Sequence, residues 1–499
     1  MRGRRRRTAL VELSTEPVVR GSAGAAEQVG RVLSCISILP AGEAACSVAG
    51  ARAALAALAV APAVIANASA AKWIDEALRR ADPEPGALAE LSAPGVTPVR
   101  AVALLREFVG DLDVSVAAVK AIAAAADAGE GEQRLAYTPG RRACVDAGAP
   151  AALVAFAGRE DVKRSAEAVR WVGEAVRNNA RAAEGGAACL AAGAAKALVG
   201  LVGAEAVKRD AEAARFVSWA LASISLSAEG VAACVSAGAV PALVALSAEP
   251  AVRGSANAAR WFGKALANIA FSADGQSACV AAGAVPALVA LSAEPAVCGS
   301  ADAAQWIAGA LVNIAVSDTG KAACVAGAAV PALVALAVEA AAHGGARAAE
   351  WIAQALASVA MSADGQAACV AAGAAPALVA LSVAPHVRVS ADATRCIAQA
   401  LNNIAGSDAG EAACVAAGAA PALVALSKEP AVRGSAGAAE QVGRALYSIS
   451  FLPASKPACV AAGAHAALAA LAVAPAVAVD AAATEWVGKA LARACACVQ

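Results

Sequence analysis

Residues Ser255–Ala270 read SANAARWFGKALANIA, and variants of this stretch recur every 45 residues along the chain. The aromatic residue near the middle recurs at the same step, although Cys396 and Gln441 replace it in two copies. The other copies carry Trp171, Phe216, Trp261, Trp306, Trp351 and Trp486. A fixed step of this length indicates one elongated array of similar units, each covering the apolar face of the next.

The beginning of the repeated stretch predicts a helix boundary. Six residues before the aromatic position, seven of eight copies have Ser or Asp, with Gly345 in the eighth. Ser and Asp side chains accept hydrogen bonds from the free N–H groups of a starting helix. The predicted caps are Ser165, Asp210, Ser255, Ser300, Ser390, Ser435 and Asp480.

One face of this predicted helix is apolar in almost every copy. In the quoted stretch it consists of Phe262, Leu266 and Ile269, spaced by four and then three residues. Side chains at that spacing lie on one side of a helix. We therefore expect this face to form the core between units.

A second face, about 100° around the helix, carries aromatic, polar and amide side chains. In the quoted stretch these are Trp261, Lys264 and Asn268. Trp261 and Asn268 are seven residues apart, which is almost two turns, so they project on the same side. Because such side chains are poor core residues, we expect a partly wetted surface that recurs in register.

Composition and charge exclude several classes of function. Lys and Arg together number 40, as do Asp and Glu, so the net charge is zero and a nucleic-acid binder is not expected. The mean hydropathy of +0.62 comes largely from Ala. No apolar run reaches the roughly 20 residues that a membrane span needs, and the best candidate, Ala53–Ala66, contains Pro62. The basic run Met1–Arg7 is interpreted as a solvated tail, with a nuclear-import signal or transit peptide as alternatives.

Eight of the 14 cysteines also follow the 45-residue step, one in each unit. Equivalent residues in neighbouring layers lie about 10 Å apart, which is too far for a disulfide. We expect buried free thiols in a reducing compartment, the cytoplasm or alternatively the nucleus. The cysteines on the step are Cys144, Cys189, Cys234, Cys279, Cys324, Cys369, Cys414 and Cys459.

No catalytic, metal or cofactor site is expected. The histidines His343, His386 and His465 fall in different units, and no carboxylate pair, nucleophile motif or phosphate loop accompanies them. Cys495 and Cys497 form an isolated C-x-C pair, which is too weak a pattern to predict a metal site.

The first 80 residues copy the last two units. Val19–Arg31 is identical to Val432–Arg444. The copy begins in the middle of a unit, at Thr8, so an apolar end is expected there and self-association through it is one possibility to test. We divide the chain into partial repeats over 1–80, a Pro-rich break over 81–95, a diverged repeat over 96–143 and regular repeats over 144–499.

Each regular unit reads as a short helix, a G-A-x-P turn, a second helix and a long helix ending A-L-x-N-I-A. Gly283–Leu291 (GAVPALVAL) and Ala265–Ala270 (ALANIA) are examples. In this order of elements Gly283 provides a left-handed cap, and Pro286 opens the second helix. The pattern resembles the armadillo repeat. The resemblance implies an all-α, right-handed superhelical solenoid of three-helix repeats.

In armadillo proteins the third helices line a concave groove, and a series of asparagines binds the backbone of an extended peptide. The resemblance therefore implies a protein-binding scaffold. An amide side chain offers both a donor and an acceptor to a peptide group. The expected contacts are Trp171, Asn178, Trp261, Lys264, Asn268, Trp306, Asn313, Trp351, Gln354 and Asn403.

Other interpretations remain open. The asparagines could instead cap carbonyl groups of neighbouring helices, and the tryptophans could pack between third helices. The whole array could be a structural component of a cytoskeletal or ciliary type. An import-receptor adaptor is a further alternative, but importin-alpha-like helices place Trp four residues before Asn, where this chain has Lys264, Gln354 or Gln399.

Arginines precede the aromatic position in the first copies of the repeat. They are Arg170, Arg215 and Arg260, whereas Glu440 and Glu485 occupy the same position near the end. These arginines could contact acidic segments of a partner, or they could be solvated helix surface.

Overall fold

The computed structural model describes residues 17–36, 55, 58–59, 61–80, 85–93, 95–127 and 137–498. All regular secondary structure in these ranges is helical. The chain separates into two compact units, Met1–Ala197 and Leu198–Gln499, with the boundary inside helix α16 (Ala194–Val202). The basic run Met1–Arg7, the start of the array at Thr8 and part of the Pro-rich break lie outside the described residues.

The first unit contains the partial, diverged and first regular repeats. Val19, Val29, Leu58 and Ile74 belong to a small apolar core shared by its first helices. Helices α9 and α10 lie within residues 96–143, the range that the sequence analysis assigned to a diverged repeat. The helices are α2 (Pro17–Arg20), α3 (Ala23–Ile36), α6 (Pro62–Ile65), α7 (Ala68–Arg80), α8 (Pro85–Ser92), α9 (Pro98–Glu107), α10 (Leu112–Ala126), α11 (Pro139–Asp146), α12 (Ala149–Ala157), α13 (Glu160–Arg164), α14 (Ala166–Ala180) and α15 (Ala183–Ala191).

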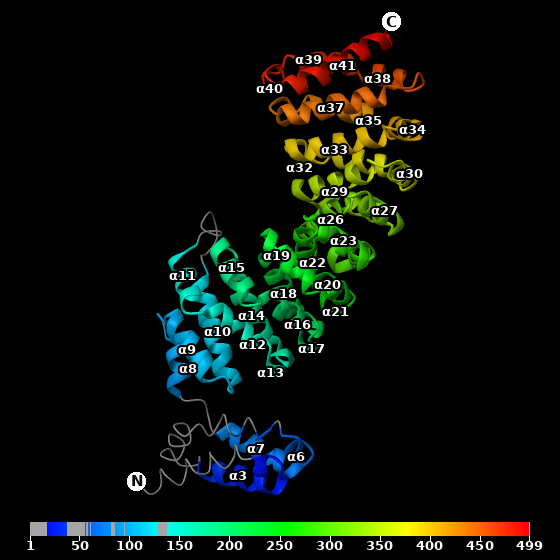
Figure 1. Cartoon of the computed structure of the whole chain (residues 1–499). Coiled ribbons are helices and arrows are strands. Elements are labelled where there is room, and N and C mark those ends of the chain that lie inside the picture. The colour runs from blue at the N-terminus through cyan, green and yellow to red at the C-terminus, as the bar shows by residue number, and fades with distance from the viewer. Residues whose placement is uncertain are drawn as a thin grey trace. The chain divides into compact units, whose positions relative to one another are not determined.

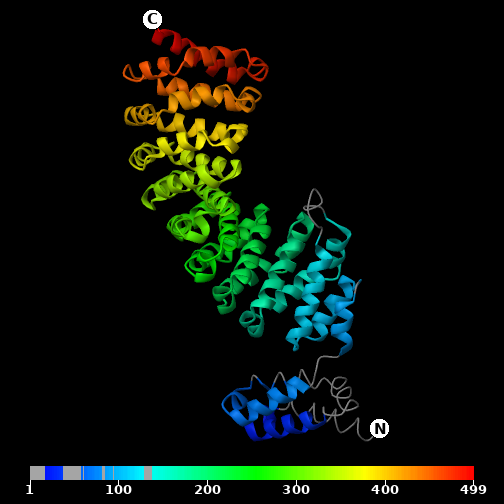
Figure 2. The same ribbon diagram turned by 180° about the vertical axis from the view of Figure 1, so that it is seen from behind.

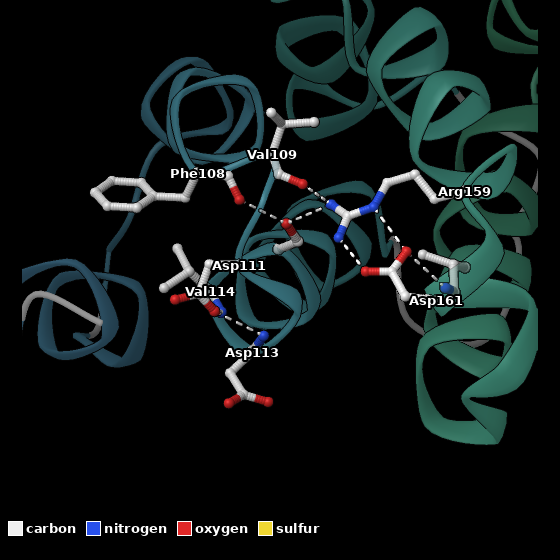
Figure 3. Close-up of polar contacts among 9 residues, drawn as sticks. Phe108, Val109, Asp111, Asp113, Val114, Arg159 and Asp161 are labelled. Atoms are coloured by element: carbon white, nitrogen blue, oxygen red, sulfur yellow. Dashed lines mark hydrogen bonds and ion pairs between the residues drawn. The ribbon is translucent and has the colours of Figure 1, made fainter. Parts of the chain in front are cut away.

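A polar network fixes the turn between α9 and α10 (Figure 3). Asp111 Oδ1 accepts hydrogen bonds from the backbone nitrogens of Asp113 (3.0 Å) and Val114 (3.1 Å), which caps the start of α10. Arg159 pairs with Asp161 and donates to the Val109 carbonyl, so the turn is tied to the start of α13. These contacts attach the diverged repeat to the regular repeat that follows it.

The second unit consists of regular repeats. Its helices are α17 (Glu205–Arg209), α18 (Ala211–Ile224), α19 (Ala228–Ser236), α20 (Ala239–Ser247), α21 (Pro250–Arg253), α22 (Ala256–Ile269), α23 (Ala273–Ala281), α24 (Ala284–Ser292), α25 (Pro295–Cys298), α26 (Ala301–Ile314), α27 (Asp318–Ala326), α28 (Ala329–His343), α29 (Ala346–Val359), α30 (Ala363–Ala371), α31 (Ala374–Ser382), α32 (Pro385–Arg388), α33 (Ala391–Ile404), α34 (Asp408–Ala416), α35 (Ala419–Ser427), α36 (Pro430–Arg433), α37 (Ala436–Ile449), α38 (Lys456–Ala461), α39 (Ala464–Ala472), α40 (Pro475–Ala478) and α41 (Ala481–Val498).

The repeat formed by α23 to α26 shows how the sequence sets these boundaries. Gly283 has φ of 72° and ends α23, as predicted, and α24 begins directly after it at Ala284. Pro286 is thus the third residue of α24 and does not open it. Pro295 begins the one-turn helix α25, which suits proline because the first helical N–H needs no partner.

The predicted caps of the third helices are confirmed. Ser300 Oγ accepts a hydrogen bond from the Ala303 nitrogen at 3.3 Å, and Asp210 Oδ1 accepts one from the Ala213 nitrogen at 2.7 Å. Gly345 has no side chain with which to cap α29. The predicted sites at Ser165, Ser255, Ser390, Ser435 and Asp480 make the same contact.

Consecutive third helices pack directly against one another. In the second unit these helices are α18, α22, α26, α29, α33, α37 and α41, which follow one another as layers (Figures 1 and 2). Phe262, Leu266 and Ile269 of α22 are buried, as predicted. The cysteines on the 45-residue step are buried and free.

Within the described ranges no single helix is both long and apolar enough to cross a bilayer, although six bent helix pairs pass the same test of combined length and composition.

Candidate functional site

Three positions on each third helix of the second unit lie on the predicted polar face. We name them the aromatic, middle and ladder positions, and in α22 they are Trp261, Lys264 and Asn268. Lys264 and Asn268 are partly exposed, but Trp261 is buried, so the expectation of a partly wetted surface is wrong for Trp261. The ladder positions of the second unit are Ser223, Asn268, Asn313, Ser358, Asn403, Ser448 and Arg493.

In several repeats of the second unit, the aromatic position of a third helix contacts the middle position of the preceding third helix. Lys264 Nζ lies 4.5 Å from the centroid of the Trp306 ring and 4.9 Å from that of Trp261, so the ammonium group lies between two tryptophans. The Trp351 ring covers Gly309, because a Cβ atom placed there would be 3.6 Å from Trp351 Cε3. The aromatic side chains therefore join neighbouring repeats, and the partly exposed Trp306 and Trp351 also reach the surface.

The contact between the aromatic and middle positions is kept in the repeat where Cys396 replaces the aromatic residue. Cys396 Sγ donates to Gln354 Oε1 at 3.2 Å, which places Gln354 at the contact between α29 and α33. Further along, Arg444 Cζ lies 4.3 Å from the ring centroid of Trp486. A small polar contact at Cys396 can thus replace a tryptophan without breaking the stack.

Trp219 is a functional candidate that the sequence analysis missed. It occupies the middle position of α18, 45 residues before Lys264, so counting back by one step would have found it. Its ring stacks on Trp261 with centroids 3.9 Å apart and planes inclined by 16°. The ring centroid of Phe216 lies 6.0 Å from that of Trp219. Here a Trp does stand four residues before the ladder position, which is Ser223 in this helix.

The ladder asparagines donate to the preceding third helix. Asn268 Nδ2 donates to the Ala222 carbonyl at 2.7 Å, and Asn313 Nδ2 donates to the Ala267 carbonyl at 2.7 Å. Asn403 Nδ2 makes the equivalent bond to Ala357 at 2.9 Å. Each bond contributes about 1 kcal/mol to the contact between repeats and also fixes the amide plane.

The asparagines differ in what their amide oxygens do. Asn403 Oδ1 accepts from Asn402 Nδ2 at 3.1 Å, so this amide is engaged at both ends. For Asn268 and Asn313, no donor to Oδ1 occurs among the residues that the structure describes. Both are partly exposed. These two neighbouring positions therefore present an oriented acceptor and a second N–H.

In the first unit, Asn178 is arranged differently. It is buried, its Nδ2 donates to the Ala123 carbonyl at 2.9 Å, and its Oδ1 accepts from Arg177 Nε at 2.8 Å. Trp171 lies beside Lys120, whose Nζ is 5.2 Å from the ring centroid and 2.7 Å from Glu167. Asn178 therefore differs from Asn268 and Asn313, because both ends of its amide are engaged within the chain.

The arginines before the aromatic position make internal contacts. Arg215 pairs with Glu212 on its own helix at 2.5 Å, and Arg260 Nη1 pairs with Asp302 of α26 at 2.7 Å. Arg170 Cζ lies 5.1 Å from the ring centroid of Trp171. Carboxylates of the chain therefore compete for Arg215 and Arg260.

Across the described part of the chain, no three His, Cys, Asp or Glu side chains are grouped so that they could hold a metal ion. A hollow of about 280 Å³ lies between α9 and α12 of the first unit, lined by Leu105, Arg106, Val109 and Phe156 among others. It is apolar apart from Arg106 and lies on different helices from the ladder positions.

Comparison with known proteins shows the fold. No protein-family model matches the chain, and no curated protein matches it. An engineered protein of known crystal structure is similar over 98% of both chains, with a TM-score of 0.62 and 24% identity. A structure from work on a phosphorylation switch that controls the interaction between cadherin and beta-catenin is similar over 98% of this chain and 90% of that one. Its TM-score is 0.56 and its identity 12%.

Designed armadillo repeat proteins for modular peptide recognition also match, over 52% of this chain and 98% of theirs, with a TM-score of 0.42 and 22% identity. At these identities the similarity concerns the fold alone. The chain is an all-α solenoid of armadillo-like repeats, as the sequence predicted.

Proposed function

We propose that the protein is a binding scaffold in which the third helices of the second unit hold an extended segment of a partner protein. Asn268 and Asn313 are the central contacts in this proposal. The observation that carries it is the pair of amides held in one orientation by the Ala222 and Ala267 carbonyls, with their oxygens still available.

Prior orientation favours binding. Because each amide is already fixed by a bond to the neighbouring helix, little side-chain entropy is lost when a peptide group pairs with the remaining oxygen and N–H. Adjacent third helices are about 10 Å apart, which matches three residues of extended chain at about 3.3 Å each. One partner peptide group can therefore meet each asparagine.

Aromatic side chains beside the asparagines provide apolar contact area. Trp219 and Trp306 are partly exposed, and Lys264 lies beside the Trp306 ring. Aromatic side chains contribute strongly to binding because they bury a large area with few rotatable bonds. Gln354 and Trp351 extend the same face by one repeat.

The test uses the full chain and a displayed library of random peptides, followed by fluorescence anisotropy with the enriched peptides made synthetically. Asn268→Ser together with Asn313→Ser should weaken binding by about tenfold, since each lost pair of bonds is worth about 0.5–1.5 kcal/mol. Serine is a matched replacement because it already occupies this position at Ser223, Ser358 and Ser448.

The reverse change provides the control. Ser358 is the ladder position between Asn313 and Asn403, and Ser358→Asn should strengthen binding by a few fold. If no peptide is enriched, or if the enriched peptides bind all three proteins equally, the third-helix face is not the binding site.

As part of this proposal the protein acts in the cytoplasm or the nucleus, where buried free thiols such as those of Cys234 and Cys279 stay reduced. Cell fractionation tests this. Self-association through the first repeat stays a prediction because Thr8 lies outside the described residues.

A further inference from the structure

A row of exposed apolar side chains follows the third helices of the second unit. Each member stands two residues beyond the end of its helix, and its exposed fraction is between 56% and 82%. The members, which we call the apolar row, are Leu226, Phe271, Val316, Met361 and Phe451. Gly406 takes the same position after α33. A periodic row of large exposed apolar side chains is typical of a contact surface.

Carboxylates accompany this row. Glu229, Asp274 and Asp364 come three residues after Leu226, Phe271 and Met361, and all three are exposed. Among the described residues of 137–498, no cationic side chain pairs with these three carboxylates, whereas Asp318 pairs with Lys321 at 2.8 Å. Acidic residues stabilise a helix start, but that role does not require an exposed Phe or Met nearby.

Phe451, the last member of the row, is contacted by a cationic side chain of the protein itself. Arg493 Cζ lies 4.5 Å from the ring centroid of Phe451. The same guanidinium donates to the carbonyls of Ser450 (3.1 Å) and Phe451 (3.3 Å), at the carboxyl end of α37. A cation is favoured there by the ring and by the negative end of the helix dipole.

Phe271 and Met361 are each followed by a carboxylate that the Phe451 position lacks. Ala454 stands three residues after Phe451, where Asp274 and Asp364 follow Phe271 and Met361. Phe271 and Met361 therefore combine an apolar side chain, a helix carboxyl end and a carboxylate, all of which attract a cationic side chain with an apolar stem.

We propose that the apolar row, with Glu229, Asp274 and Asp364, binds a segment of a partner protein in which an Arg or Lys and an apolar residue recur every three residues. The row borders the ladder positions, because the backbone nitrogen of Phe271 donates to the Asn268 carbonyl at 3.3 Å. This inference goes beyond the proposed function, because it assigns binding to different side chains and predicts that the partner segment is positively charged.

The experiment measures binding of labelled synthetic peptides to the full chain by fluorescence anisotropy. The probe is a peptide of repeated Arg-Leu-Ser triplets, compared with peptides of Glu-Leu-Ser and Arg-Ser-Ser. Only the first should bind well, and its affinity should fall by about tenfold between roughly 50 and 300 mM salt. Binding of the Glu-Leu-Ser peptide with equal affinity would overturn the proposal.

Variants locate the site. Phe271→Ser with Met361→Ser, and separately Asp274→Asn with Asp364→Asn, should each weaken binding by about tenfold, and the second pair should also reduce the salt dependence. Val389→Ser with Val479→Ser is the matched control, since these valines are equally exposed but follow the short helices α32 and α40. All these side chains are on the surface, so folding should be preserved, which circular dichroism checks.

The Asn268→Ser and Asn313→Ser protein separates this inference from the ladder function. Loss of binding only in the apolar-row and carboxylate variants supports the inference even if the ladder has no role. Loss only in the ladder variant, or equal loss in the Val389 and Val479 control, overturns it.

Discussion

Ala328 is the residue at which sequence and backbone conformation conflict. Its φ of 57° makes it the one residue other than glycine with a positive φ in the described part of the chain. Gly283 and Gly373 occupy the same position in the neighbouring repeats, with φ of 72° and 71°. A side chain in this region costs about 1–2 kcal/mol, so one repeat carries strain that the others avoid.

Ala328→Gly should therefore stabilise the protein by about 0.5–1 kcal/mol, after the larger entropy of glycine in the unfolded chain is subtracted. The measurement is the midpoint of urea unfolding, followed by far-UV circular dichroism. Gly373→Ala is the mirror control and should destabilise by a similar amount. A lower midpoint for Ala328→Gly would show that the left-handed conformation is not strained there.

At the scale of the helix, close packing between α22 and α26 depends on Gly263. A Cβ atom added at Gly263 would lie 3.0 Å from the Trp306 carbonyl carbon and 3.1 Å from the Ile307 nitrogen. Backbone atoms cannot rotate away, so the two helices would have to separate. Gly488 occupies the same position in α41, where no atom lies within 4 Å.

Gly263→Ala should destabilise the protein by about 1–3 kcal/mol because of overpacking. Gly488→Ala should instead stabilise it by up to about 1 kcal/mol, since alanine is the better helix former. Hydrogen exchange of the amides in α22, α26 and α41 measures both effects locally. The same sign of change at both positions would contradict this account of the packing.

The sequence correctly predicted the features that depend on the residues of a single helix or repeat. The Ser and Asp caps, the apolar face of Phe262, Leu266 and Ile269 and the buried cysteines all follow from local chemistry repeated at a fixed step. The short helix α25 was missed because Pro295 and Gly299 also suit a turn. The bond from Asn268 to the Ala222 carbonyl was one of two alternatives that the sequence left open, because no single repeat encodes the distance between two helices. The stacking of Trp219 on Trp261 depends on the same distance.

At the scale of the whole molecule, the array buries a thiol in every regular repeat. Burial raises the pKa of the thiols of Cys234, Cys279, Cys324 and Cys369 to about 12, from an ordinary value of 9.0. Above about pH 9 the unfolded chain loses these protons while the folded chain keeps them. The free energy of unfolding therefore falls as the pH rises from about 9 towards 12.

The thiolate absorbance of these four buried cysteines should accordingly appear together with unfolding rather than before it. At neutral pH a thiol reagent should label Cys298 and Cys495, which are partly or fully exposed, and should reach the buried thiols only in denaturant. Rapid labelling of Cys279 in the folded protein would contradict the packing of the repeats.

The central claim is that Asn268 and Asn313 recognise the backbone of an extended partner segment. The most direct measurement is a scan in which each backbone nitrogen of a selected peptide is methylated in turn and its Kd determined by anisotropy. The account predicts about tenfold losses at two positions three residues apart, which vanish in the Asn268→Ser and Asn313→Ser protein. Losses without this spacing, or losses that persist in that variant, would contradict it.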